Sequence, residues 1–125
     1  MTELVLKEEV YEIVGAAMDV YYQLGRGFLE PVYQEALQIE LSRRAIPFEA
    51  QKELTICYKG VYAREEIRSR PRLLRTNIAE LKVCERLQGQ EVAQVINYLK
   101  ATGCRVGLLI NFGSRVRLEW RRYVL

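Results

Sequence analysis

Three consecutive segments in the C-terminal half limit the folds that this chain can adopt. Residues 78–83 read IAELKV, a short strand, and residues 91–102 read EVAQVINYLKAT, with apolar side chains at the spacing of an amphipathic helix. Residues 105–112 read RVGLLINF, and so few polar interruptions are typical of a strand that is buried on both faces. A strand, a helix and a buried strand in this order predict an αβ crossover within one sheet.

Two helices and two further strands complete the expected order. Residues 7–24 and 28–44 carry apolar side chains at helical spacing, with a glycine-containing turn between them. Residues 53–58 and 117–125 alternate as strands do. We therefore predict an α/β fold in which two N-terminal helices lead into a mixed β-sheet, built as a single domain over residues 1–125.

The composition excludes several kinds of site. The 125 residues include no histidine and only three, widely spaced cysteines, so neither a zinc site nor a disulfide framework is expected. Chemistry in this chain therefore has to use carboxylates, lysine, tyrosine or a hard metal ion bound by oxygen. The net charge of +3 permits a polyanionic partner without arguing for one.

The sequence also bears on location and assembly. The first residues, MTELVLKEEV, are acidic where a signal peptide has a cationic start, and no apolar stretch approaches the ~18 residues needed to span a bilayer. We expect a cytoplasmic protein without membrane contact. A monomer and a homo-oligomer are both compatible with the sequence.

Glu80 and Lys82 are the first candidates for chemistry. They lie two residues apart in the expected strand 78–83, so their side chains point to the same face. An acid and a lysine projected together from a central strand are costly to bury unless they are paired or bind a ligand. On spacing alone, a salt-bridged pair on a solvated face is favoured over a functional site.

Three residues on the expected helices are weaker candidates. Glu30 and Tyr33 lie three apart near the start of the second helix, where a carboxylate favours the helix dipole whatever its function and a tyrosine is typical of the core. Gln94 lies on the helix 91–102 and is, by itself, typical of a polar residue at a helix edge.

Several ordered motifs together point to a family. The stretches LGRGFLEPVYQEAL, IAELKV, QVINYLKATG and GLLINFG resemble the GxxExxY family of small prokaryotic proteins, whose name motif is met by Gly27, Glu30 and Tyr33. That family is similar to a compact branch of the PD-(D/E)xK nuclease superfamily, which has a restriction-endonuclease-like core. The resemblance covers residues 10–125 apart from one gap.

The resemblance implies a Mg²⁺-dependent nuclease that hydrolyses phosphodiesters in DNA or RNA. In such folds an Asp on one strand and the Glu of an ExK motif on the next bind the ion through oxygen, and the ion polarises the scissile phosphate and activates a water. Carried over to this chain, Glu80 is the metal ligand and Lys82 the catalytic lysine. Glu30 is an accessory catalytic carboxylate supported by Tyr33, and Gln94 points at the site from the crossover helix. Given the family resemblance, a functional site at Glu80 and Lys82 is favoured over a salt-bridged pair on a solvated face.

The gap in the resemblance falls on residues 64–77, which read REEIRSRPRLLRTN. The family pattern has an Asp about ten residues before the glutamate of ELK, and that position is Arg70. A cation there would repel a metal ion, and Pro71 cannot donate to a central sheet ladder. The segment is therefore an atypical replacement of the expected Asp-bearing strand.

Three interpretations of this segment stay open. In the first, a degenerate nuclease fold uses the arginines to bind phosphates without catalysis. In the second, the segment is an exposed loop with no function. In the third, the segment was translated in a different reading frame from that of the family. The arginines concerned are Arg64, Arg68, Arg70, Arg72 and Arg75.

The third interpretation is compatible with the genetic code. Permissible codons for residues 66–77, read one nucleotide later, encode KYEADLACYEQ and run into IAELK, which puts an Asp at the position of Arg70. We therefore favour two compensating frameshifts, near residues 64–67 and 77–78, over an arginine patch. Codons in the coding DNA that are incompatible with the shifted reading would exclude this interpretation.

The chain as written lacks one metal ligand, so we predict a GxxExxY-type, nuclease-like protein with weak or absent cleavage. One alternative is a non-catalytic nucleic-acid-binding or protein-interaction module on the same fold. Another is a folding-impaired product whose missing strand leaves a sheet edge exposed.

Overall fold

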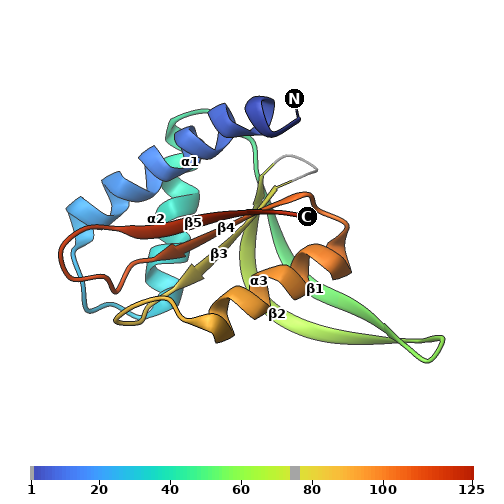
Figure 1. The fold of residues 1–125 in the computed structure, drawn as a ribbon. Coiled ribbons are helices and arrows are strands. Elements are labelled where there is room, and N and C mark those ends of the chain that lie inside the picture. Colours follow the sequence, from blue (N-terminus) through green and yellow to red (C-terminus); the bar gives the residue numbers. More distant parts are fainter. Residues whose placement is uncertain (1, 74–76) are drawn as a thin grey trace.

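The computed structural model describes the backbone of residues 2–73 and 77–125 and the side chains of residues 8–48, 56–63 and 78–125. The chain forms a five-stranded sheet with helices on both faces (Figure 1). In chain order the elements are α1 (Thr2–Leu24), α2 (Glu30–Arg43), β1 (Glu49–Tyr58), β2 (Val61–Leu73), β3 (Asn77–Lys82), α3 (Gly89–Thr102), β4 (Val106–Asn111) and β5 (Glu119–Val124). The predicted α/β class, with two N-terminal helices and a mixed sheet, is confirmed. None of the helices in the described ranges is both long and apolar enough to cross a membrane.

The strands lie in the sheet in chain order, from β1 to β5. β3 and β4 pair in parallel, whereas the other neighbouring strands pair antiparallel. α3 connects the two parallel strands, so the predicted αβ crossover is confirmed. Because parallel strands run in the same direction, β3 and β4 end at the same edge of the sheet, which we call the carboxyl edge.

The alternation of β3 decides which way its side chains face. Ala79 and Leu81 belong to the main core, together with buried residues of α1 and α2. Ile78 lies in a second cluster on the other face, under α3. Glu80 and Lys82 share the alternation of Ile78, so they face α3.

The central strand β4 is buried at every position, as its apolar sequence predicts. Gly107 shows how closely α3 packs on it, because a Cβ built at this position would lie only 2.8 Å from Cγ2 of Val95. The glycine therefore allows the crossover helix to lie directly on the strand, which fixes the height of α3 above β3 and β4.

The segment that the sequence leaves unassigned forms most of a strand. β2 pairs with β1 along its length, with Arg70 opposite Gln51 and Pro71 opposite Ala50. The interpretation of this segment as an exposed loop is therefore wrong for the backbone as far as Leu73. β2 pairs with β3 only at its last two residues, so Pro71 lies where β2 has an edge without a ladder partner, and a proline is tolerated there.

The predicted phosphate-binding arginines of this segment lie outside the described residues. The side chains of Arg64, Arg68, Arg70 and Arg72 lie outside the described ranges, and Arg75 lies outside the described backbone. The expectation that they bind phosphates therefore stays a prediction.

Candidate active site

Glu80, Lys82 and Gln94 are brought together on the α3 face of the sheet. Lys82 Nζ lies 3.4 Å from Oε1 of Glu80 and donates a hydrogen bond of 2.5 Å to Oε1 of Gln94. The first two residues come from β3 and the third from the crossover helix. The path of the chain through α3 therefore assembles the cluster.

Burial distinguishes this cluster from a surface ion pair. Glu80 is 0% exposed, and the Lys82 side chain keeps only 20% of its accessible surface. The interpretation of the pair as lying on a solvated face is therefore wrong for Glu80. Burial of a carboxylate is costly unless cations or donors compensate it, and the ammonium group of Lys82 supplies one such cation.

The geometry leaves Lys82 able to act on a ligand. An ammonium group has three donors, and Glu80 and Gln94 engage two directions around Nζ. The remaining direction and the partial exposure of the side chain allow a contact with an anionic ligand. Gln94 fixes where the ammonium group lies, because its amide oxygen accepts from Nζ while its helix packs on the sheet.

Tyr33 is part of the structure of the loop that precedes α2. Its ring is buried and stacks on the ring of Phe112, with centroids 4.7 Å apart. Its hydroxyl donates to the carbonyl of Gly25 at 2.6 Å and accepts from the backbone N–H of Phe28 at 3.3 Å. Gly27 lies inside this loop with a φ of 109°, a conformation that favours glycine. The glycine and tyrosine of the GxxExxY motif therefore share one structural task, which is to set the start of α2.

Glu30 lies in the first turn of α2, on the opposite side of the sheet from the α3 face. The start of α2 is held at the carboxyl edge, since Arg26 Nε donates to the carbonyl of Gly113 at 3.1 Å just beyond β4. The structure thus brings Glu30 to the edge at which β3 ends. Among the described interactions, none joins Glu30 to Glu80 or Lys82.

The register of β2 and β3 bears on the missing aspartate. The two strands pair at Arg72–Ile78 and Leu73–Asn77. The pairing ends there, so Arg70 on β2 and Glu80 on β3 each lie two residues beyond the last pair of the ladder. The position at which an Asp is expected therefore lies on the strand next to that of Glu80, and its side chain lies outside the described residues.

Comparison with known proteins identifies the family. The family model described as "PD-(D/E)XK nuclease superfamily" matches residues 7–123. The chain belongs to the PD-(D/E)XK nuclease superfamily. No curated protein and no solved structure matches the chain. The (D/E)xK part of the superfamily's name is met by Glu80, Leu81 and Lys82, whereas the PD part has no counterpart at Ser69 and Arg70.

The residues described do not fit the divalent metal that a PD-(D/E)XK nuclease is expected to use. Within the ranges whose side chains are described, no group of three or more His, Cys, Asp or Glu side chains could hold a metal ion. Glu80 supplies one carboxylate, and Glu30 lies across the sheet from it. A hard cation such as Mg²⁺ needs several oxygen ligands, so the side chains that the structure describes offer an incomplete set.

Asn111 is a buried polar residue that the sequence analysis missed. It is fully buried at the end of β4, and its amide group bonds both the N–H and the carbonyl of Cys84 at 3.0 and 2.9 Å. It also donates to Glu119 at 3.1 Å and accepts from the N–H of Gly113 at 3.0 Å. A polar residue inside the run GLLINF was the signal that could have revealed it, because buried polar groups are hydrogen-bonded.

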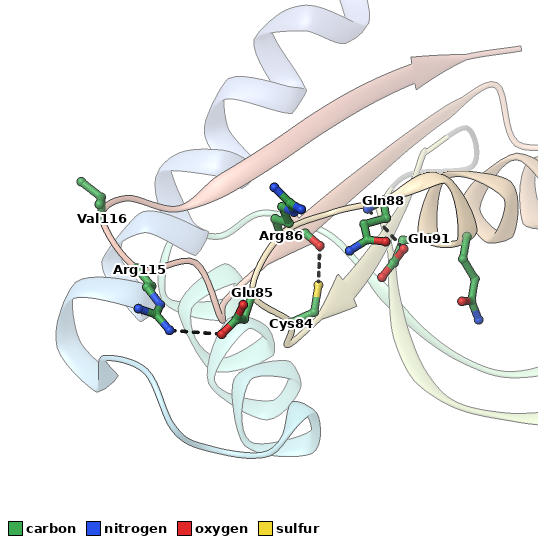
Figure 2. A pocket seen from close by; sticks show the side chains of 8 residues that line it. Cys84, Glu85, Arg86, Gln88, Glu91, Arg115 and Val116 are labelled. Atoms are coloured by element: carbon green, nitrogen blue, oxygen red, sulfur yellow. Dashed lines mark hydrogen bonds and ion pairs between the residues drawn. The ribbon is translucent and has the colours of Figure 1, made fainter.

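A cavity of about 650 Å³ lies beside the loop that joins β3 to α3 (Figure 2). Cys84 lines it, and the sulfur donates to the carbonyl of Arg86 at 3.4 Å. Burial raises the pKa of the Cys84 thiol, and the charges of Glu91 and Glu119 raise it further, whereas the charge of Lys82 lowers it. The electrostatic influence of Lys82 therefore reaches this cavity.

Proposed function

We propose that this chain is a GxxExxY-type, nuclease-like protein that acts on phosphodiesters of nucleic acid, with cleavage impaired because Arg70 replaces the metal-binding aspartate. The observation that carries the proposal is the cluster of Glu80, Lys82 and Gln94, in which a partly exposed ammonium group is fixed beside a buried carboxylate. Membership of the PD-(D/E)XK superfamily supports nucleic acid as the substrate.

Lys82 is the residue that contacts the substrate in this proposal. Its ammonium group attracts a phosphate oxygen and stabilises the negative charge that develops on it during hydrolysis. Gln94 and Glu80 hold the ammonium group in place, which removes the cost of ordering a flexible side chain when the substrate binds. Glu30 has the role of an accessory carboxylate at the carboxyl edge. The incomplete set of ligands means that no step is assigned to Mg²⁺.

A second candidate is a nucleic-acid-binding module without catalysis. An arginine at the position of the expected Asp favours it, since a cation at this position serves phosphate binding and opposes metal binding. Arg68, Arg72 and Arg75 would then add further phosphate contacts. A protein-interaction module on the same fold has no comparable observation in its favour.

Restoring the aspartate tests the proposal. The substitution Arg70→Asp is expected to produce Mg²⁺-dependent cleavage of single- or double-stranded DNA or RNA, and a further Glu80→Ala or Lys82→Ala is expected to abolish it. Arg105→Asp is the matched control, because it makes the same change of charge at an exposed position before β4 and should leave the protein inactive.

Two outcomes would contradict parts of the proposal. A folded Arg70→Asp protein that is inert on all four substrates excludes the nuclease and leaves the binding module. If the unaltered chain already cleaves as fast as the Arg70→Asp protein, the impairment is wrong. Sequencing the coding DNA across residues 64–78 tests separately whether Arg70 arises from a shifted reading frame.

A further inference from the structure

A second hollow adjoins the cavity of Figure 2 and extends it along the carboxyl edge. Each has a volume of about 650 Å³, and the two share Glu85, Arg86 and Val116 as lining residues. We call the joined hollows the edge groove. Gln90, one helical turn before Gln94 on α3, lines its inner end. The edge groove therefore extends from the start of α3 to α1 and β5.

The outer wall of the edge groove is fixed by buried hydrogen bonds. The hydroxyl of Tyr21 on α1 donates to the carbonyl of Ser114 at 2.5 Å. The Ser114 hydroxyl donates to the carbonyl of Asn111 at 3.0 Å and accepts from the N–H of Glu119 at 3.1 Å. These bonds tie the loop between β4 and β5 to α1, so the groove is formed before any ligand binds, and a preformed site loses less entropy on binding.

Aromatic side chains line the outer half of the edge groove. Tyr22 is 69% exposed and lines the groove beside the partly exposed Trp120 of β5. Met18 is 37% exposed and lines the same wall. Exposed aromatic faces stack on unpaired bases, and each such contact contributes about 1–3 kcal/mol.

The charges that line the edge groove leave two arginines for a ligand. Three arginines and three glutamates line it, and each glutamate has a partner. Glu85 pairs with Arg115 at 3.1 Å, whereas Glu91 and Glu119 accept from the backbone N–H groups of Gln88 at 3.3 Å and Leu87 at 2.8 Å. Within the part of the chain that the structure describes, neither Arg86 nor Arg117 forms an ion pair, and both are exposed in the groove. Two such guanidinium groups beside aromatic faces complement a ligand that carries both phosphates and bases.

We propose that the edge groove binds unpaired nucleotides of a single-stranded nucleic acid, with bases against Tyr22 and Trp120 and phosphates on Arg86 and Arg117. This inference rests on the proposed function and names the class of its substrate. A duplex does not fit the arrangement, because its bases are stacked on one another and present no free faces to the tyrosine and the tryptophan.

The single tryptophan of the chain, Trp120, gives a direct measurement. Titration of the full-length protein with a short oligothymidylate is expected to quench its fluorescence. A duplex of the same length, and an abasic oligonucleotide of the same length with phosphates but no bases, should quench it much less. Arg86→Ala, Arg117→Ala and Tyr22→Ala should each raise the Kd for the oligothymidylate about tenfold. Arg105→Ala removes the same charge from an exposed position before β4, away from the groove, and should leave the Kd unchanged.

Three outcomes would overturn the inference. One is quenching by the abasic oligonucleotide, or by polyglutamate, that equals quenching by the oligothymidylate. Another is tighter binding of the duplex. The third is a Kd for the oligothymidylate that is the same in Arg86→Ala and in Arg117→Ala as in Arg105→Ala, with circular dichroism showing that these variants are folded. Quenching without cleavage in the Arg70→Asp protein would contradict only the nuclease, and cleavage without quenching would contradict only the edge groove.

Discussion

Lys82 Nζ lies 3.4 Å from Oε1 of Glu80, and both side chains leave β3 on the face that α3 covers. The carboxylate is inaccessible and the ammonium group is partly exposed. The ammonium group of Lys82 thus lies between the buried carboxylate of Glu80 and the solvent. This arrangement explains why a strand in the centre of a sheet can carry two charges and still pack.

Removal of the cation should cost stability. Lys82→Met is expected to lower the free energy of unfolding by about 1–3 kcal/mol, because the buried carboxylate of Glu80 loses a compensating charge. In the double variant Glu80→Gln/Lys82→Met the loss should be smaller than the sum of the single losses, since a neutral amide needs no cation. Urea denaturation at neutral pH measures the free energy of unfolding of Lys82→Met, Glu80→Gln and the double variant.

Lys100→Met is the control for this cycle. Lys100 is exposed on α3, so its loss should change stability by no more than about 0.5 kcal/mol. If Lys82→Met proved as stable as the unaltered protein, the ammonium group would not be what compensates Glu80.

The start of α2 should depend on the tyrosine hydroxyl and on one glycine. Tyr33→Phe is expected to cost about 1–2 kcal/mol, because the partly buried carbonyl of Gly25 loses its bond from the hydroxyl. Gly27→Ala should cost about 1–3 kcal/mol, since a φ of 109° is strained for alanine although the space around it is open.

Gly89→Ala is the matched control for the glycine. It lies at the start of α3, no atom within 4 Å would meet the new Cβ, and its φ is not in the left-handed range. Thermal unfolding compares the stability of Tyr33→Phe, Gly27→Ala and Gly89→Ala. Equal stability of Gly27→Ala and Gly89→Ala would contradict a conformational role for Gly27.

The junction between β3 and β4 should be intolerant of a single added carbon. A Cβ at Gly113 would lie 2.5 Å from the carbonyl oxygen of Cys84 and 2.7 Å from its nitrogen, and neither backbone atom can move freely because Asn111 bonds both. Gly113→Ala is therefore expected to cost at least ~2 kcal/mol. A similar loss is expected for Asn111→Leu, which leaves the two backbone groups of Cys84 without their partner. Both are measured against Gly89→Ala by urea denaturation.

The helices and the crossover could be predicted from the sequence because their signal is local. Apolar residues at helical spacing identify α1, α2 and α3, and a continuous apolar run identifies β4. β2 was missed because Pro71 and the arginines around it have no alternation. The turn at Lys59 and Gly60, both with positive φ, could have predicted its start, since a two-residue turn of this kind joins the strands of a hairpin.

The candidate site was predictable only in part, because its key property is not local. That Glu80 and Lys82 share a face follows from their spacing, but whether that face is solvated depends on α3, whose position above β3 is set by packing on Gly107.

The pKa of the Cys84 thiol should respond to the charges of Glu91, Glu119 and Lys82. Burial and the charges of Glu91 and Glu119 raise its pKa, so at about pH 8 less of it is thiolate than for an ordinary cysteine and iodoacetamide should alkylate it more slowly. Lys82 acts in the opposite direction. Lys82→Met should therefore raise the pKa of the thiol further and slow alkylation about threefold, whereas Glu91→Gln should lower the pKa and speed it by a similar factor. The rate should increase with pH through a midpoint above that of an ordinary thiol.

The exposed Cys57 is an internal control for this measurement, since it lies at the end of β1, and its alkylation rate should be the same in all variants. Peptide mapping by mass spectrometry separates the two rates as a function of pH. An alkylation rate of Cys84 that is unchanged in Lys82→Met would mean that the ammonium group does not act on the cavity beside it, and the link between the Lys82 cluster and the inner end of the edge groove would be lost.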